Sequence, residues 1–236
     1  MIRPEMEIRC IRVIGKSRVQ MNERIARESR LELVVNGKIT KTFNYTPGLE
    51  EELVLGYLIS SATITEPNQI NAMELTNSTC TLSLANTKAE VDLRNEHESM
   101  IVHFTDLQFM RKMLFENQHH HKSTRGFHGA IIYQPNTGKH FHCEDIGRHN
   151  TVDKVIGLVF RNDYSLLDCI IMTTGRLTCS IVSKCVNAGV PVLVSMTVAT
   201  DKGIAIAKNS NLTLIGSLTD TECWLYHEGD VKINLN

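Results

Sequence analysis

The second half of the chain alternates short apolar runs with segments of helical periodicity, and this alternation restricts the folds open to it. The runs LLDCIIM and VPVLVSM are apolar at successive positions, as in strands buried on both faces. We therefore predict a three-layer α/β domain with a mainly parallel sheet and one antiparallel hairpin. The expected strands are 129–133, 139–143, 167–173, 190–195 and 212–216, and the expected helices begin at 151, 178 and 201.

The first half of the chain has a β-rich pattern. The segment 31–43 reads as two strands around the turn Asn36-Gly37, and the apolar spacing after Pro47 and Gly48 predicts a helix. Alternation over 70–93 indicates further strands, and 105–117 reads as a helix capped by Thr105. We expect a β-rich domain at 1–104, a helical connector at 105–124 and the α/β domain at 125–236.

Charge and cysteine usage exclude several classes of protein. With 25 basic and 26 acidic residues the formal net charge is −1, which gives no overall attraction to nucleic acid or to an anionic membrane. The start of the chain lacks the apolar run of a secretory signal, and no later run is long enough to span a bilayer. The seven cysteines are scattered without a CxxC pair, so we expect reduced thiols and a cytoplasmic protein.

Three strand-to-helix junctions carry most of the chemically active side chains. They are EDIGRHN at 144–150, TTGR at 173–176 and SMTVAT at 195–200, and in a parallel sheet such junctions meet at one edge. Gly147 and Gly175 permit close backbone approach, Asn150 can cap a helix, and Arg148 with Arg176 can clamp phosphate oxygens. We predict a diphosphate or nucleotide site here. The alternative is an internal ion pair between Asp145 and Arg148.

Other reactive residues lie near these junctions. His128 enters the first strand of the α/β half and can face the same pocket, whereas the run His119-His120-His121 reads as a solvated connector. Cys143 and Cys179 lie beside helix N-termini, so we expect a lowered thiol pKa for both. Cys169 and Cys185 read as small buried apolar residues.

A zinc site of the nucleobase-deaminase type is a further reading of this region. His142-Cys143-Glu144 has the H-x-E pattern, but the P-C-x-x-C half of that motif is missing. Cys179 and Cys185 are six residues apart rather than three, so they would need a different geometry. We expect no catalytic metal.

The motifs together resemble the FdhD family, the formate dehydrogenase accessory sulfurtransferases. The resemblance is carried by EDIGRHNTVDKVIG, by TTGR, by K-x-x-x-x-G-V-P-V at 184–192, by LTLIG at 212–216 and by the early NGKITKTFNYTPGLEEELVLGYLIS. It implies a cytidine-deaminase-like α/β domain with a smaller β-rich domain, and a homodimer. It also implies binding of a bis(guanine dinucleotide) molybdenum cofactor, sulfur delivered by a cysteine desulfurase, and formate dehydrogenase as the recipient.

The junctions and the resemblance together nominate site residues. The candidate sulfur carriers are Cys143 and Cys179. The candidate cofactor-binding residues are His128, Asp145, Gly147, Arg148, His149, Asn150, Thr174, Gly175, Arg176, Ser195, Thr200, Gly216, Ser217, Leu218 and Thr219.

The chain departs from the family pattern at four places. The family's CGxCG-type loop, one cysteine of which holds the persulfide, has no counterpart, because residues 81–142 contain no cysteine. The family's TGG-x-H reads Thr124-Arg125-Gly126-Phe127-His128 here. Met196 and Thr219 stand where the family has arginine, and each lost phosphate contact removes a charge-assisted hydrogen bond worth about 1.5 to 3 kcal/mol.

Three functions therefore remain open from the sequence. The leading one is an FdhD-like factor that binds the molybdenum cofactor and assists its sulfuration. The second is a divergent paralogue that binds or delivers a cofactor or nucleotide without transferring sulfur. The third is a zinc hydrolase of the deaminase type.

Overall fold

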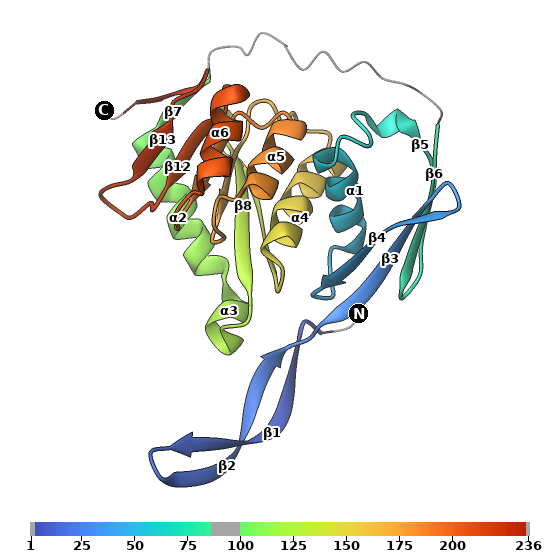
Figure 1. The fold of residues 1–236 in the computed structure, drawn as a ribbon, viewed down its shortest axis with the longest axis vertical. Helices are drawn as coiled ribbons and strands as arrows, with labels where there is room; N and C mark the ends of the chain where they lie inside the picture. The colour runs from blue at the N-terminus through green and yellow to red at the C-terminus, as the bar shows by residue number, and fades with distance from the viewer. Residues whose placement is uncertain (1–2, 86–99, 235–236) are drawn as a thin grey trace.

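The computed structural model describes residues 3–85 and 100–234 (Figure 1). Its described strands form four sheets, and the largest has six strands in the order β13-β12-β11-β10-β8-β9. The bounds of these strands are β8 His128–Gln134, β9 Lys139–Asp145, β10 Ile170–Thr173, β11 Val192–Ser195, β12 Thr213–Gly216 and β13 Trp224–His227.

The pairing in the six-stranded sheet is mixed. Strands β10, β11 and β12 pair in parallel, but β8 is antiparallel to both β10 and β9, and β13 is antiparallel to β12. The expectation of a mainly parallel sheet with one antiparallel hairpin is therefore wrong, because antiparallel pairs of strands outnumber parallel ones in this sheet. Strand β9 nevertheless runs in the same direction as β10 to β12, because two antiparallel steps separate it from β10.

Helices cover both faces of this sheet. The helix α2 (Phe104–Asn117) packs on one face, where Leu107 and Met110 join Ile131 and Met172 in one apolar cluster. The opposite face is covered by α4 (Arg148–Arg161), α5 (Cys179–Asn187) and α6 (Asp201–Asn209). The predicted three layers are thus present, and each helix buries one apolar stripe, as the sequence periodicity indicates.

The N-terminal part supplies a second, smaller sheet of order β4-β3-β6-β5. The predicted hairpin at Asn36-Gly37 is confirmed, since both residues adopt positive φ between β3 and β4. The short helix η1 (Pro67–Gln69) precedes the third strand of this sheet in chain order. The bounds are β3 Ser29–Val35, β4 Lys38–Tyr45, β5 Ile70–Leu75 and β6 Thr79–Leu84.

Several elements were not expected from the sequence or begin elsewhere. Helix α2 is preceded by His103, whose backbone N–H donates to Asp106 at 2.8 Å, so Thr105 is not its cap. Helix α4 begins at Arg148, one turn before the expected position. The predicted strand at 89–93 lies outside the described residues. The unpredicted elements are β1 Glu5–Ile14, β2 Ser17–Ala26, β7 Ile101–His103, α3 His119–Thr124, β13 and β14 Lys232–Asn234.

Helix α1 (Glu50–Ser60) joins the two sheets by packing directly on α4. The contact depends on Gly56 and Gly157, each of which faces the backbone of the other helix. A Cβ at Gly56 would lie 1.7 Å from the carbonyl oxygen of Asp153, and one at Gly157 would lie 2.0 Å from that of Glu52. The apolar core therefore runs without a break from β3 of the small sheet, through α1 and α4, to the six-stranded sheet.

None of the described helices is long and apolar enough to cross a lipid bilayer.

Replacement of Gly157 by Ala should destabilise the protein, although alanine is normally the better helix former. The added methyl group has no room against the Glu52 carbonyl, so α1 and α4 must separate. We expect a loss of about 1–3 kcal/mol in the free energy of unfolding, measured by urea denaturation. Lys202→Ala, on the exposed side of α6, is the control and should change stability by less than about 0.5 kcal/mol.

Candidate functional site

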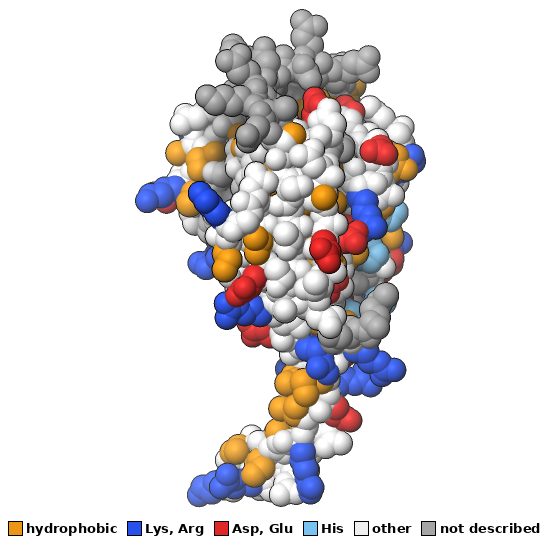
Figure 2. All heavy atoms as spheres, turned by 90° about the vertical axis from the view of Figure 1, so that its right-hand side faces the viewer, with side chains coloured by type: hydrophobic (Ala, Val, Ile, Leu, Met, Phe, Trp, Pro, Cys, Tyr) orange, Lys and Arg blue, Asp and Glu red, His pale blue; other side chains and the backbone are white. Residues whose placement is uncertain are grey.

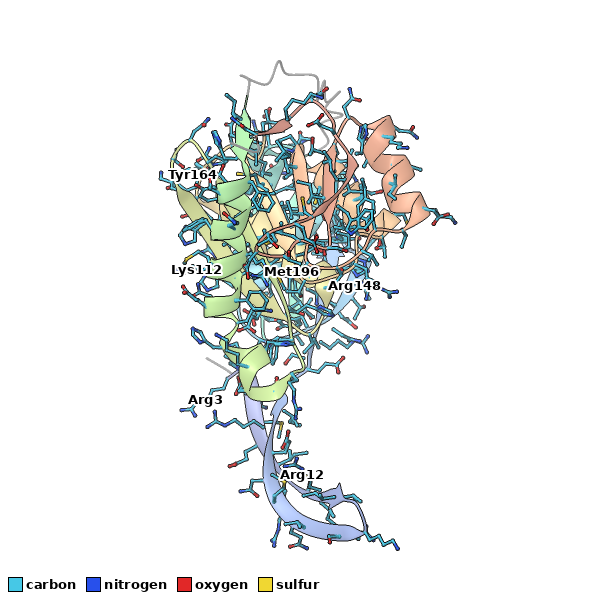
Figure 3. All side chains as sticks on the ribbon, turned by 90° about the vertical axis from the view of Figure 1, so that its left-hand side faces the viewer. Arg3, Arg12, Lys112, Arg148, Tyr164 and Met196 are labelled. Atoms are coloured by element: carbon cyan, nitrogen blue, oxygen red, sulfur yellow. The ribbon has the colours of Figure 1, made fainter. Side chains whose placement is uncertain are left out.

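The predicted junctions meet at one edge of the six-stranded sheet. Because β9, β10, β11 and β12 run in the same direction, the loops that follow them leave from the same end. Thr173 at the end of β10 pairs with Ser195 at the end of β11, and Asp145 at the end of β9 pairs with His128 at the start of β8. Figure 3 labels Arg148 and Met196 at this edge, which lies toward the β1–β2 hairpin.

Asp145 lies beneath the first junction and is completely buried. One carboxylate oxygen accepts hydrogen bonds from the backbone of Thr46 at 3.0 Å and from Lys154 Nζ at 2.7 Å. The other accepts from the backbone of Gly147 and from Asn150 Nδ2, both at 2.8 Å. Both oxygens are thus used within the protein, so Asp145 shapes the junction rather than facing a ligand. Its charge partner is Lys154 and not Arg148.

Asn150 belongs to the same network and does not cap α4. Its side-chain amide donates to the Asp145 carboxylate and to the backbone carbonyl of Asn44, both at 2.8 Å. The residue preceding α4 is Gly147, and no side chain caps the helix there. The predicted capping role is therefore wrong, because the amide is already used to hold β4 against β9.

Arg148 opens α4 and packs its aliphatic stem on Gly175 of the second junction. A Cβ at Gly175 would lie 2.9 Å from the Cβ of Arg148, so a larger residue there would displace the arginine. The Nε of Arg148 is buried and has no hydrogen-bond partner among the described residues. The site therefore holds a cation that the surrounding described structure does not neutralise.

Two histidines beside Arg148 remain neutral at physiological pH. Burial, and then the positive charge of Arg148, lowers the pKa of His128, and the same two causes lower the pKa of His149 to about 4. His149 Nε2 lies 2.8 Å from Ser180 Oγ, and His128 Nδ1 lies 3.3 Å from Thr174 Oγ1. Both rings can exchange hydrogen bonds with a ligand without carrying a charge themselves.

A cavity of about 510 Å³ opens at this edge beside His128. We call it the His128 cavity. The junctions contribute Ile146, Thr174 and Met196, while α2, α3 and the loop that follows contribute most of the opposite wall. None of the lining residues is acidic. The complete lining is Phe115, Gln118, His121, Lys122, Arg125, Gly126, Phe127, His128, Ile146, Thr174 and Met196.

The two arginines predicted to clamp a phosphate do not line this cavity. Arg176 is exposed, and Arg148 is half-buried against Gly175. The cationic lining comes instead from Lys122 and Arg125, which sequence reasoning missed. Arg125 was visible in the sequence as a replacement within the TGG-x-H pattern, whereas Lys122 follows three histidines and gave no separate signal.

The remaining nominated residues hold the shape of the junctions. Ser195 is buried and donates from Oγ to the Gly175 carbonyl at 2.7 Å, and Thr200 caps α6 by accepting from the backbone of Gly203. Gly216 packs against the ring of Tyr226. In the same turn the Ser217 N–H donates to the Thr197 carbonyl, Leu218 is buried, and Thr219 bonds within its own turn to Glu222.

The two candidate sulfur carriers have opposite surroundings. Cys143 is buried, and its Sγ donates to the Thr151 carbonyl at 3.3 Å. Burial raises the pKa of Cys143 to about 12, so the expected lowering of its pKa is wrong. Cys179 is the first residue of α5 and is exposed. All seven cysteines lie in the described ranges, and Cys179 alone among them is exposed.

The described residues contain no group of three or more side chains placed to hold a metal ion. Glu144, the acidic residue of the H-x-E pattern, accepts hydrogen bonds from the backbone of His120 at 2.8 Å and of His121 at 2.7 Å. Glu144 therefore satisfies free backbone N–H groups in the first turn of α3. His120 in turn contacts Glu5 at 2.6 Å, so the histidine run is tied to the first strand.

Comparison with known proteins identifies relatives over nearly the whole chain. The model of the FdhD/NarQ family matches residues 26–105 and 94–232. The chain is 28% identical to Protein FdhD of Methanocaldococcus jannaschii, over 91% of this chain and 93% of that protein. It is 26% identical to the Sulfur carrier protein FdhD of Sulfurisphaera tokodaii, over 93% of this chain and 95% of that one.

A crystal structure of a protein from Desulfotalea psychrophila, proposed to be a formate dehydrogenase accessory protein, has the same fold. It superimposes with a TM-score of 0.84 at 22% identity, over 98% of this chain and all of that one.

Removal of the buried Lys154 ammonium group should destabilise the protein. Lys154→Ala leaves the Asp145 carboxylate buried without its charge partner, and breaking such a pair costs about 3–5 kcal/mol in the free energy of unfolding. Urea denaturation measures the loss. Lys208→Ala, at an exposed position of α6, is the matched control; equal stability of the two variants would show that the pair contributes nothing.

Proposed function

We propose that this chain, which belongs to the FdhD/NarQ family, is a sulfur carrier that binds a guanine-dinucleotide molybdenum cofactor and assists its sulfuration for formate dehydrogenase. The observation that carries the proposal is the His128 cavity, with its cationic and aromatic lining and no acidic side chain. Flat apolar side chains suit a purine base, and cations suit the phosphates of a dinucleotide.

The positive charge of this cavity comes from α3 and the residue after it, not from the third junction as the resemblance implies. The family's arginine in the third junction is Met196 here, while Arg125 stands where the family has glycine. Arg125 adopts a φ of 59°, in the left-handed region that favours glycine and costs other residues about 1–3 kcal/mol. A cationic side chain is thus kept at an unfavourable backbone position, which supports a role in binding an anion.

Arg148 supports the same proposal from the sheet side. It has a buried guanidinium nitrogen without a described partner, and its charge adds to the effect of burial in lowering the pKa of the neighbouring His128. Arg148 does not line the His128 cavity, but its charge acts on His128, which does, and a bound phosphate would accept a hydrogen bond from the neutral ring of His128. In this proposal the cofactor is a substrate, which binds in the cavity and is then released.

We assign the sulfur carrier to Cys179. A persulfide must be loaded by a desulfurase and must then give its sulfur to the cofactor, and Cys179 is exposed while Cys143 is buried. In the loading step the Cys179 thiolate attacks the outer sulfur of a persulfide on a cysteine desulfurase. The new S–S bond forms as the old one breaks, and the desulfurase leaves as its thiolate.

The proposal extends to architecture and partners. The three layers around the mixed sheet support a cytidine-deaminase-like description of the α/β part. The partners are a cysteine desulfurase as sulfur donor, formate dehydrogenase as recipient and a second copy of the chain in a homodimer.

A second function is favoured by one observation. Residues 81–142 contain no cysteine, although the resemblance places the persulfide loop there. A protein that binds and delivers the nucleotide-bearing cofactor without transferring sulfur would need the His128 cavity but no reactive thiol. Nucleotide binding and sulfur loading therefore need separate experiments.

Titration with GDP, followed by calorimetry, tests the binding site. Arg125→Gly should weaken GDP binding by roughly tenfold or more, because a charge-assisted contact of about 1.5–3 kcal/mol is lost. Its backbone should tolerate the change, since the φ of this residue suits glycine. Lys112→Ala removes a positive charge from an exposed position of α2 outside the cavity and should leave the affinity unchanged. Equal affinity of all three proteins would exclude the cavity as the site.

Incubation with a cysteine desulfurase and cysteine tests the sulfur carrier. Intact-mass measurement should show a gain of one sulfur that reduction removes. Cys179→Ser should abolish this gain, while Cys143→Ala should retain it because that thiol is buried. Wild-type protein that binds GDP but gains no sulfur would support the carrier-free alternative.

A further inference from the structure

The first two strands form an arm that stands away from the rest of the molecule (Figure 1). Strands β1 and β2 pair antiparallel over ten residues each. At about 3.4 Å per residue the arm is about 34 Å long. Its base is fixed to α3, because the Glu5 carboxylate accepts from Ser123 Oγ at 2.6 Å and contacts His120. The arm therefore holds its far end away from the body of the protein.

The far half of the arm, residues 9–22, carries basic side chains and no acidic one. We call this segment the arm tip. Its basic residues are Arg9, Arg12, Lys16 and Arg18. Without these four charges, the 25 basic and 26 acidic residues of the chain leave a net charge of −5. The formal net charge of −1 is therefore the sum of a cationic arm tip and an acidic remainder.

The length of the arm lets the charge of its tip act independently of the body. At physiological ionic strength the field of a charge is screened over about 8 Å. The arm extends several times that distance, so the acidic side chains of the body do not cancel the attraction of the arm tip for an anion. The acidic residues of the arm itself, Glu5, Glu7 and Glu23, lie in the half nearer to the body.

Exposed aliphatic side chains lie on both faces of the arm tip. Residues directly opposite each other in an antiparallel pair point to the same face, and successive pairs point to opposite faces. Figure 2 shows hydrophobic side chains along the arm and basic side chains at its end. The four aliphatic side chains at the end of the arm are between 48% and 64% exposed. Their pairs are Ile11–Gln20 and Val13–Arg18 on one face, and Arg12–Val19 and Ile14–Ser17 on the other.

This pattern fits the surface of an anionic lipid bilayer better than a protein or a nucleic acid. A groove on a protein covers one face of a ribbon and leaves the aliphatic side chains of the other face in water. Single-stranded nucleic acids bind by stacking on aromatic side chains, and the arm has none. A bilayer surface surrounds both faces, while the long side chains of arginine and lysine reach the lipid phosphates.

We propose that the arm tip binds the surface of a bilayer that contains anionic phospholipids. The aliphatic side chains enter the boundary between headgroups and acyl chains, and the four basic side chains contact phosphates. The tip stays out of the hydrocarbon core, because the outer edges of a two-stranded ribbon carry unpaired backbone N–H and C=O groups that need polar partners. This inference goes beyond the proposed function and does not depend on it.

Flotation of the full chain with lipid vesicles tests the electrostatic contribution. Wild-type protein should float with vesicles of equimolar phosphatidylcholine and phosphatidylglycerol, but not with vesicles of phosphatidylcholine alone. Arg12→Gln and Arg18→Gln, one on each face, should each weaken binding by roughly fivefold, since each lost cation removes its attraction to the anionic surface. Lys208→Gln removes a positive charge from an exposed position of α6 and is the matched control, which should bind like the wild type.

A second variant tests the aliphatic contribution. Val13→Thr combined with Ile14→Thr keeps β-branched side chains in the strand, and both positions are exposed, so the arm should fold normally. The double variant should bind the mixed vesicles roughly tenfold more weakly or worse, because it removes one apolar group from each face.

Each outcome supports or overturns the proposal. Circular dichroism spectra like that of the wild type should show that the variants fold. Wild-type protein that does not float with the mixed vesicles would overturn the proposal and would leave an acidic protein as the partner of the arm. Undiminished binding of both arginine variants would also overturn it, and so would undiminished binding of the threonine double variant. The GDP titration and the sulfur-loading assay report separately on the proposed function.

Discussion

The buried carboxylate of Asp145 is the interaction on which the functional edge depends. Four donors from three parts of the chain converge on it: the segment after β4, the turn before α4, and α4 itself. An unpaired charge at this depth would be strongly unfavourable, so the donors and the carboxylate have to assemble together. Their assembly fixes where α4 starts, and thereby places Arg148 at the edge of the sheet with its stem against Gly175.

Much of the secondary structure could be predicted because it depends on local pattern. The turn at Asn36-Gly37, helix α1 and the alternating elements after Gly126 follow from periodicity and turn chemistry. Strand direction could not be predicted in this way, since the antiparallel pairing of β8 with β10 is a contact between distant segments. The position of the β1–β2 hairpin away from the body could not be predicted, because its alternation of apolar and charged residues is that of an ordinary half-buried strand.

The junctions meet at one edge of the sheet, as predicted, but the cavity beside them has walls that the sequence did not indicate. The convergence of the junctions follows from the shared direction of β9 to β12. The other wall of the His128 cavity comes from α2 and α3, whose placement depends on packing across the whole sheet. Lys154 was missed for a related reason, because a lysine in an amphipathic helix reads as a surface residue unless the buried partner is known.

The glycine contact between α1 and α4 has a consequence for how relatives of this chain can diverge. Gly56 and Gly157 are a hundred residues apart in the sequence, yet each is required by the backbone of the other's helix. The β-rich and α/β parts therefore cannot be exchanged between homologues as independent modules. A chimera would fold only if α1 and α4 came from the same parent protein, so the two halves of the chain must evolve together.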